Sequence, residues 1–399
     1  MEWYPDNPRD RLLKGPAMTT LAHLTRQVPA VADLLDTTAP AAAACGPLRR
    51  LEVPARVQGS YTTRFVDERL AADPTAFHLI AGADVSPRPG DVVLARVGEI
   101  RQHRRVETPD SRKAILFPGA LILLAYGHRY AADQFLAHVP PTLDHCHLVA
   151  AGGIAGVVTH THDRVDEPTL IEPLGLLATR DGVVSIADAA PLSNPLDATP
   201  RTDRPRVIAV LGTSMNSGKS TVAACLVNGL SAEGHRVGAG KITGTGAGND
   251  RMHYHDAGAH AVLDFTDFGY ATTFRLEFAD IRALTLNMIH ALADTGADTV
   301  IVEIADGVYQ EETARLLRDA TFRASVDAIV FAATDALGAR AGVAELLDAH
   351  LPVTAAAGVM TASPLATAEA SIVLGELGVP VVGTYDLTDP AVARGVLPQ

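Results

Sequence analysis

The chain has 399 residues, of which 47% are hydrophobic and 20% charged, and its formal net charge is −13. This length is too great for one ordinary core and suits two domains of a soluble globular protein. The acidic balance argues against a nucleic-acid partner, because such binding depends on basic side chains that neutralise phosphates. The N-terminus lacks the apolar core of a signal peptide and no apolar run is long enough to span a bilayer, so we expect a cytoplasmic protein without a membrane partner.

The first part of the chain divides into two regions. Residues 1–46 are predicted to be a helical or extended segment, because LAHLTRQVPAVADLL repeats apolar residues at helical spacing. From 47 to 192, runs such as DVVLARVGEI, ALILLAYG and HLVAAGGIAGVV are rich in Val, Ile and Leu and are separated by turn-forming pairs. These runs predict a β-rich domain, either a small barrel or a sandwich. The basic run 101–113 is broken by acids and is interpreted as a solvated hairpin face.

The second part of the chain alternates between strands and helices. SNPLDATPRTDRP (193–205) has the composition of a linker, and residues 206–399 form the second predicted domain. There the strands RVIAVLG, RVGAGKITG, DTVIVEIAD, VDAIVFAATD, PVTAAAGVM and PVVGTYD alternate with helical segments. Such alternation predicts an α/β fold with a mostly parallel sheet, here a P-loop nucleotide-binding domain preceded by the smaller β-rich domain.

The segment GTSMNSGKST lies between the strand RVIAVL and the helix TVAACLVNGL. Glycines allow a backbone to fold around phosphate oxygens, while successive N–H groups and the helix N-terminus supply positive potential. We predict that Lys219 reaches the terminal phosphates and that Ser220 binds Mg²⁺. The predicted cofactor-binding residues are Gly212, Thr213, Ser214, Met215, Asn216, Ser217, Gly218, Lys219, Ser220 and Thr221.

Counted from Thr213, this loop has the form GT-x4-GK-[ST], which resembles dethiobiotin synthetase and its cobyrinic acid synthase-like relatives. The resemblance implies that Lys241, in VGAGKITGTG, faces the transferred phosphoryl group. It also implies a Mg²⁺ site formed by Asp250, with Asp256 as an alternative, and Glu303 at the end of VIVEI, with Asp306 close behind. The chain departs from the pattern at Met215–Ser217 and in IADG after Glu303, so the resemblance indicates Mg-nucleotide chemistry and not dethiobiotin synthesis.

A second resemblance covers roughly 205–395. The chain has ITGTG, AVLDFTDFG and VIVEI in the order in which similar segments occur in the uncharacterised domain family 1611, which includes D-glutamate N-acetyltransferases. This resemblance implies an alternative in which the loop binds the pyrophosphate of acetyl-CoA.

Further polar residues are weaker candidates. His253 or His255, in RMHYHDAGAH, could contact substrate or transfer protons, and His255 is included among the predicted catalytic residues with Lys219, Lys241 and Glu303. Asp335 and Arg340 follow a strand at the edge where α/β sheets bind ligands. A second group could make a zinc site, although surface or core histidines are the favoured interpretation; it comprises His145, Cys146, His147, His160 and His162.

Together these observations predict an ATP- and Mg²⁺-dependent enzyme that activates or phosphorylates a small carboxylate or carbamate substrate. The alternatives are an N-acyltransferase that uses acetyl-CoA and a nucleotide-dependent switch or chaperone GTPase. The sequence has no [NT]-K-x-D guanine signature, which argues against the GTPase alternative. The resemblance to dethiobiotin synthetase also implies a homo-oligomer.

Overall fold

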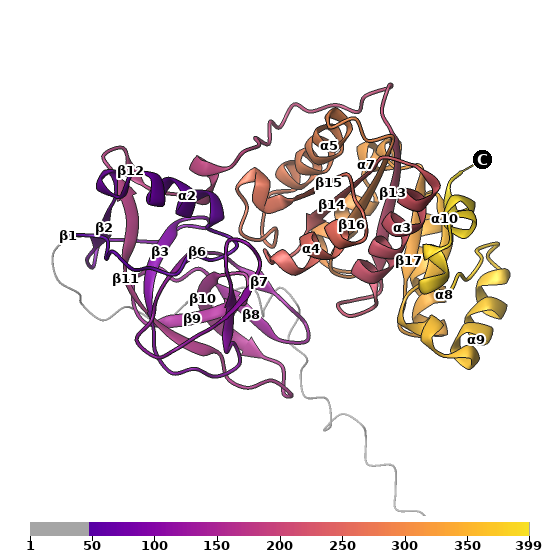
Figure 1. Cartoon of the computed structure of the whole chain (residues 1–399). Helices are drawn as coiled ribbons and strands as arrows, with labels where there is room; N and C mark the ends of the chain where they lie inside the picture. Colours follow the sequence, from indigo (N-terminus) through magenta and orange to yellow (C-terminus); the bar gives the residue numbers. More distant parts are fainter. Residues whose placement is uncertain (1–47, 399) are drawn as a thin grey trace, which may run out of the picture. The chain divides into compact units, whose positions relative to one another are not determined.

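The computed structural model describes residues 48–398, and the predicted segment 1–46 lies outside them. The described residues belong to one compact unit that contains a ten-stranded, a six-stranded and a two-stranded sheet. The ten strands run from β1 (Arg49–Leu51) to β12 (Gly182–Val183), and Figure 1 shows them in indigo to magenta. Between these bounds lie β2 (His78–Ala81), β3 (Val92–Val97), β6 (Leu121–Tyr126), β7 (Arg129–Tyr130), β8 (Phe135–His138), β9 (Cys146–Ala150), β10 (Ile154–Thr161) and β11 (Thr169–Thr179).

Five of these strands close into a small barrel. β11 pairs with β3, β3 with β6, β6 with β10, β10 with β9, and β9 returns to β11. The structure thereby decides between the two predicted architectures. Aliphatic side chains alternate along these strands between two buried clusters: one contains Val92, Leu94, Leu123 and Ile154, and the other contains Val93, Ile122, Leu124 and Leu148. The basic run forms the hairpin of β4 (Arg105–Glu107) and β5 (Lys113–Ile115), and helix α2 (Arg64–Ala72) was not predicted.

The six-stranded sheet is wholly parallel and has the order β15-β14-β16-β13-β17-β18. Its strands are β13 (Arg206–Gly212), β14 (Val237–Thr243), β15 (Ala261–Asp264), β16 (Thr299–Ile304), β17 (Ala328–Ala332) and β18 (Val353–Ala357). This confirms the predicted fold class: an α/β domain with a parallel sheet, preceded by a β-rich region. The predicted domain boundaries, including the linker 193–205, stay predictions.

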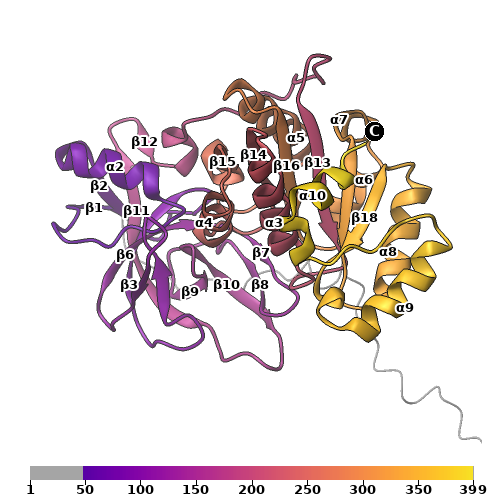
Figure 2. The same cartoon turned by 45° about the vertical axis from the view of Figure 1, so that its right-hand side comes forward.

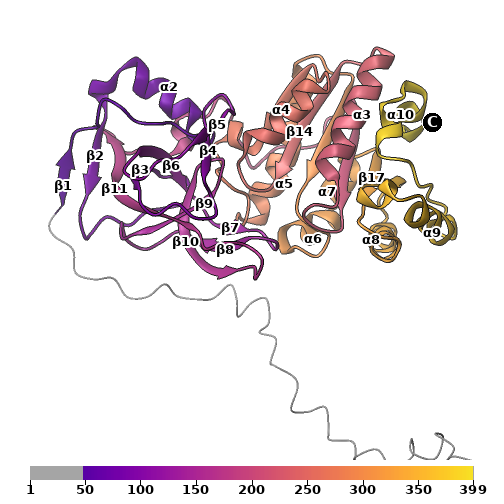
Figure 3. The same ribbon diagram turned by 60° about the horizontal axis from the view of Figure 1, so that its bottom comes forward.

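Helices cover both faces of the parallel sheet (Figures 2 and 3). Along β13, Val207, Ala209 and Leu211 pack toward α5 (Phe278–Asp294), whereas Ile208 and Val210 pack toward α3 (Lys219–Glu233). The face of α5 also receives α6 (Glu311–Leu317), α7 (Ala320–Ser325), α8 (Ala336–Asp348) and α9 (Pro364–Gly375); the face of α3 receives α4 (Gly248–Asp256) and α10 (Pro390–Val396). Strands buried on both faces explain why this half of the sequence reads as continuous apolar runs.

Several predicted elements differ from the structure. PVVGTYD is not a strand: only Val381 forms a bridge, to Ala356, before the chain turns at Gly383 into the 3-10 helix Tyr385–Thr388. HLVAAGGIAGVV is two strands instead of one, because Gly153 adopts a positive φ of 103° and reverses the chain between β9 and β10. EETARLLRDATF is likewise two short helices, since Asp319 caps a new helix through its bonds to the N–H groups of Thr321 and Phe322.

Buried polar contacts join the β-rich region to the parallel-sheet domain. Arg64 of α2 forms an ion pair with Asp267 at 2.7 Å, and both side chains are buried. The Tyr61 hydroxyl donates to Asp264, and the N–H of Gly248, at the start of α4, donates to Glu107 at 2.7 Å. Within residues 48–398, no helix is long and apolar enough to cross a membrane.

Candidate functional site

The segment GTSMNSGKST forms a tight loop between β13 and α3. A side chain at Gly212 would place its Cβ 2.4 Å from Ser217 Oγ, so only glycine fits there. Gly218 has a positive φ of 98° and is the N-cap of α3. Among the described residues, the N–H groups of 214–218 find no backbone acceptor. Free N–H groups at a helix N-terminus form a cradle for an anion.

Lys219 lies inside this cradle and is 6% exposed. Its Nζ donates to the carbonyl oxygen of Ser214 at 2.7 Å, so the side chain bends back over the loop. Burial lowers the pKa of Lys219, while Glu303 and Asp306 act in the opposite direction. Two buried hydroxyls of the loop, Thr213 Oγ1 and Ser217 Oγ, have no partner among the described residues. Unpaired buried polar atoms are costly, and phosphate oxygens are suitable acceptors for them.

Lys241 and two carboxylates meet beside the loop. The parallel register places Lys241, near the end of β14, directly opposite Glu303 on β16. Lys241 Nζ lies 3.4 Å from Glu303 Oε1 and forms a closer ion pair with Asp250 of α4. Burial disfavours the Lys241 charge, but both carboxylates outweigh it and raise its pKa; the pKa of Asp250 is lowered by Lys241 against its own burial. The predicted residues Lys219, Lys241, Asp250 and Glu303 are thus brought together.

Tyr254 belongs to the same cluster and was missed by the sequence analysis. Its hydroxyl donates to Glu303 Oε2, and burial together with Glu303 raises its pKa well above the ordinary value. The hydroxyl of Ser220 lies close enough to Asp250 and Tyr254 to act on both, and it favours their charged forms. Asp250 and Tyr254 are four residues apart on α4 and therefore share one face of the helix. Treating this segment as helical would have revealed the pair.

The histidines predicted in RMHYHDAGAH differ in their position relative to this cluster. The side chain of His255 is 73% exposed and lies 3.8 Å from Asp256, which is 81% exposed, so neither is part of the cluster. His253 lies close enough to Asp250 to lower the pKa of that carboxyl and stacks on Tyr254 with ring centroids 6.5 Å apart. His260 is hydrogen-bonded to Arg236 at 2.7 Å and takes no part in the site.

The histidines of the β-rich region do not gather into one site. Cys146 is buried and burial raises its pKa to about 12, whereas His147 accepts from the N–H of Val158 at 3.1 Å. His145, His160 and His162 are exposed. Across residues 48–398, no group of three or more His, Cys, Asp or Glu side chains has the arrangement of a metal site.

The loops after β17 and β18 border the phosphate loop. The N–H of Val359, in the loop after β18, donates to the carbonyl oxygen of Ser217 at 3.1 Å and so fixes the end of the phosphate loop. Asp335 caps α8 by accepting from Gly338 N at 2.8 Å, beside Thr213. Arg340 pairs with Glu376 at 3.1 Å on the surface between α8 and α9, away from this site.

The β7–β8 hairpin of the β-rich region also reaches the phosphate loop. Asn216, at the centre of the loop, donates through Nδ2 to Asp133 Oδ2 at 2.5 Å. Asp133 Oδ1 is buried without a partner among the described residues. The neighbouring Arg129 is buried, which lowers its pKa to about 10, and it donates to Gln134 at 2.9 Å. The β-rich region therefore contributes directly to the surroundings of the loop.

The donor set fits Mg²⁺ bound together with phosphates. Mg²⁺ prefers oxygen ligands and usually takes one or two carboxylates, with water and phosphate oxygens completing the octahedron. Asp250, Glu303 and the Ser220 hydroxyl offer these oxygens beside the loop. The single ammonium group of Lys241 pairs with both carboxylates in the present arrangement.

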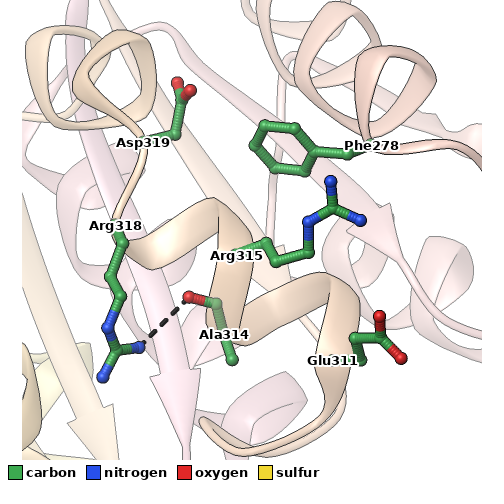
Figure 4. Close-up of a pocket in the computed structure, with 6 residues that line it drawn as sticks. All are labelled: Phe278, Glu311, Ala314, Arg315, Arg318 and Asp319. Atoms are coloured by element: carbon green, nitrogen blue, oxygen red, sulfur yellow. Dashed lines mark hydrogen bonds between the residues drawn. The ribbon is translucent and has the colours of Figure 1, made fainter.

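A separate hollow on the surface lies between α5 and α6, where Arg315 lies over Phe278 (Figure 4). It contains none of the residues of the candidate site.

The fold and the loop together define the C-terminal domain as a P-loop NTPase fold. No protein-family model and no curated protein matches the chain. The signal recognition particle receptor FtsY from Elizabethkingia anophelis is 17% identical over 54% of this chain and 76% of its own, with a TM-score of 0.35. The signal recognition particle 54 kDa protein from Aeropyrum pernix, in complex with GDP, is 19% identical over 53% and 50%, with a TM-score of 0.35. Likeness at this level identifies neither a substrate nor an activity.

Proposed function

We propose that the P-loop domain binds ATP with Mg²⁺ and activates or phosphorylates a small substrate that carries a carboxylate or carbamate. The observation that carries this proposal is the meeting of two lysines, Lys219 and Lys241, with the carboxylates Asp250 and Glu303 beside a loop of free N–H groups. Two cations at one end of an anion cradle suit a group whose negative charge is redistributed during transfer.

Each residue has a distinct task in this proposal. The N–H groups of 214–218 hold the phosphates, and Lys219 exchanges the Ser214 carbonyl for a phosphate oxygen. Ser220, Asp250 and Glu303 hold Mg²⁺, which supplies neutralisation of phosphate charge. The ammonium group of Lys241 would stabilise the transferred phosphoryl group, and Asp250 and Glu303 hold that side chain beside the loop.

The proposed reaction is a simple displacement at phosphorus. A carboxylate oxygen of the substrate forms the new O–P bond while the bond from the γ-phosphorus to the β–γ bridging oxygen breaks. The electron pair of the broken bond goes to that oxygen, so the products are ADP and an acyl phosphate. The acyl phosphate can be released, or the nitrogen of an amine can attack its carbonyl carbon. The C–N bond then forms while the C–O bond to the phosphate breaks, and inorganic phosphate and the proton of the amine leave. We also propose that the chain acts as a homo-oligomer in the cytoplasm.

Calorimetric titration with ATP, GTP and acetyl-CoA, each with and without Mg²⁺, tests the proposal. We expect Mg²⁺-dependent ATP binding that Lys219→Ala weakens by at least ~10-fold, because a charge-assisted contact to phosphate is lost. Lys113→Ala, which alters an exposed lysine of β5, is the matched control and leaves binding unchanged. GTP binding in place of ATP would favour the switch, acetyl-CoA binding without ATP binding would favour the acyltransferase, and either result overturns the proposal.

A further inference from the structure

A small cavity adjoins the lysine and carboxylate cluster where β14 and β16 end. Its volume is about 10 Å³, which is room for one water-sized group. Gly244 forms part of its wall and lies against Lys241, since a Cβ at Gly244 would be 3.0 Å from Lys241 Cε. The residues that matter most in its lining are Tyr130, Thr243, Thr273, Phe274, Asp306 and Glu312.

Asp306 is the group in this cavity that lacks a partner. Its side chain is half-buried and lines the cavity, yet it makes no hydrogen bond or ion pair to another residue within 48–398. Lys219, Lys241 and Arg129 act on it only at a distance. Each of these cations is already engaged: Lys219 with Ser214, Lys241 with Asp250 and Glu303, and Arg129 with Gln134. A carboxylate that borders a cavity without a contact partner is available to pair with a cationic group bound there.

The remaining walls also suit a positive charge. No Lys, Arg or His lines the cavity within the described residues, whereas two carboxylates do. Glu312 accepts from the N–H of Arg275 at 2.7 Å, and its carboxylate lines the cavity. Tyr130 and Phe274 also line the cavity, and the centroids of their rings are 5.4 Å apart. Aromatic faces attract cations. Threonine hydroxyls and the carbonyl oxygens of the strand ends can accept hydrogen bonds.

We propose that this cavity is a subsite for the primary ammonium group of an amine substrate, with Asp306 as its ionic partner. An ammonium group is the size of a water molecule and has three donors, which match the Asp306 carboxylate and the threonine oxygens. This proposal rests on the proposed function, in which the amine is the second substrate beside the phosphoryl-activated carboxylate. In this proposal, bound phosphates engage the positive charges of Lys219 and Lys241. The electrostatic stabilisation that these two lysines give to the Asp306 carboxylate then becomes weaker, which favours a cation in the cavity.

The test measures binding and does not depend on turnover. Thermal unfolding of the full chain is followed in increasing methylammonium chloride, with Mg²⁺ and a non-hydrolysable ATP analogue present and chloride held constant. We expect a saturable rise in Tm for the wild-type chain. Tetramethylammonium is too large for the cavity and has no N–H donor, and K⁺ lacks directional donors, so neither reproduces the rise.

Variants assign the effect to the cavity. Asp306→Asn weakens the apparent affinity for methylammonium by at least ~10-fold, because the charge-assisted hydrogen bond is lost. Asp181→Asn, at an exposed turn, is the control and leaves the affinity unchanged. If Asp306→Asn does not fold, as judged by circular dichroism, Glu312→Gln replaces it and weakens the affinity in the same direction.

The outcomes separate the two proposals. No methylammonium effect, an equal effect of K⁺ or tetramethylammonium, or an unchanged affinity in the variant would overturn the subsite. Calorimetric binding of the nucleotide is measured on the same samples. A chain that binds Mg·ATP without responding to methylammonium refutes the subsite alone, and a chain that responds to methylammonium without binding ATP refutes the proposed function alone.

Discussion

Removal of the Asp267 carboxylate tests how the β-rich region is fixed to the P-loop domain. Asp267 is 2% exposed and accepts from Arg64 of α2 at 2.7 Å and from Arg251 of α4 at 2.6 Å. Its Oδ2 also accepts from the N–H of Asp264 at 2.8 Å. Asp267→Asn therefore removes the paired carboxylate from the buried guanidinium group of Arg64 and from the half-buried one of Arg251.

The expected loss of unfolding free energy is about 3–5 kcal/mol, the usual cost of removing one partner from a buried ion pair. Burial and the nearby Asp264 carboxylate raise the pKa of Asp267 despite the two arginines. The folded state therefore disfavours the charged Asp267 carboxylate on balance, so we expect a loss at the lower end of this range. The control is Asp166→Asn, whose 66%-exposed side chain lies 3.5 Å from Arg104 and which should cost at most about 1 kcal/mol.

Urea denaturation of the two variants, followed by circular dichroism, provides the measurement. A loss for Asp267→Asn no larger than that for Asp166→Asn would refute the reasoning that the buried network holds the regions together. In addition, Arg251 lies on α4 next to Asp250. We therefore expect the Asp267→Asn chain to bind Mg·ATP less tightly as well, because α4 loses one of its anchors.

Three further predictions concern the loop and the thiols. Gly212→Ala should abolish ATP binding in calorimetry, because its Cβ would lie 2.4 Å from Ser217 Oγ; unchanged affinity would show that the loop is not built as described. ATP affinity should fall as the pH rises past the lowered pKa of Lys219, since phosphate binds the charged form; a flat profile up to pH ~10 would contradict this. Cys146, with its pKa of about 12, should resist alkylation in the native chain at mildly basic pH, as mass spectrometry would show, and should react fully in urea; rapid native reaction would disprove its burial.

Local chemistry explains which features could be predicted from the sequence. The loop between Gly212 and Thr221 is recognisable because its glycines, lysine and hydroxyl are contiguous and lie between a strand and a helix. The parallel sheet follows from apolar runs that alternate with helical segments, and β13, β14, β16, β17 and β18 all coincide with such runs. The resemblance to dethiobiotin synthetase placed Lys241 and Glu303 near the loop. The structure brings them there because the parallel strands β14 and β16 end at the same edge of the sheet.

Other features depend on contacts between distant parts of the chain. Asp133 and Tyr130 reach the loop and the cavity from the β-rich region, and nothing in the local pattern of a β-hairpin indicates this. Tyr254 joins the cluster because α4 directs it toward Glu303, whereas adjacent His255 is turned to solvent. PVVGTYD has the composition of a strand, but at the end of the chain it meets β18 only at Val381.

The sequence by itself determined the class of fold and the phosphate cradle, since both depend on residues that are neighbours along the chain. Only the tertiary structure decided the closure of the β-barrel, because ring closure requires β9 to pair with both β10 and β11. It also decided the partners of the titratable groups. Lys241 contacts Glu303 on the neighbouring strand and Asp250 on α4, whereas the Asp306 carboxylate contacts no cation within residues 48–398. Burial and charge pairing depend on what surrounds a side chain in space, and sequence periodicity does not contain that information.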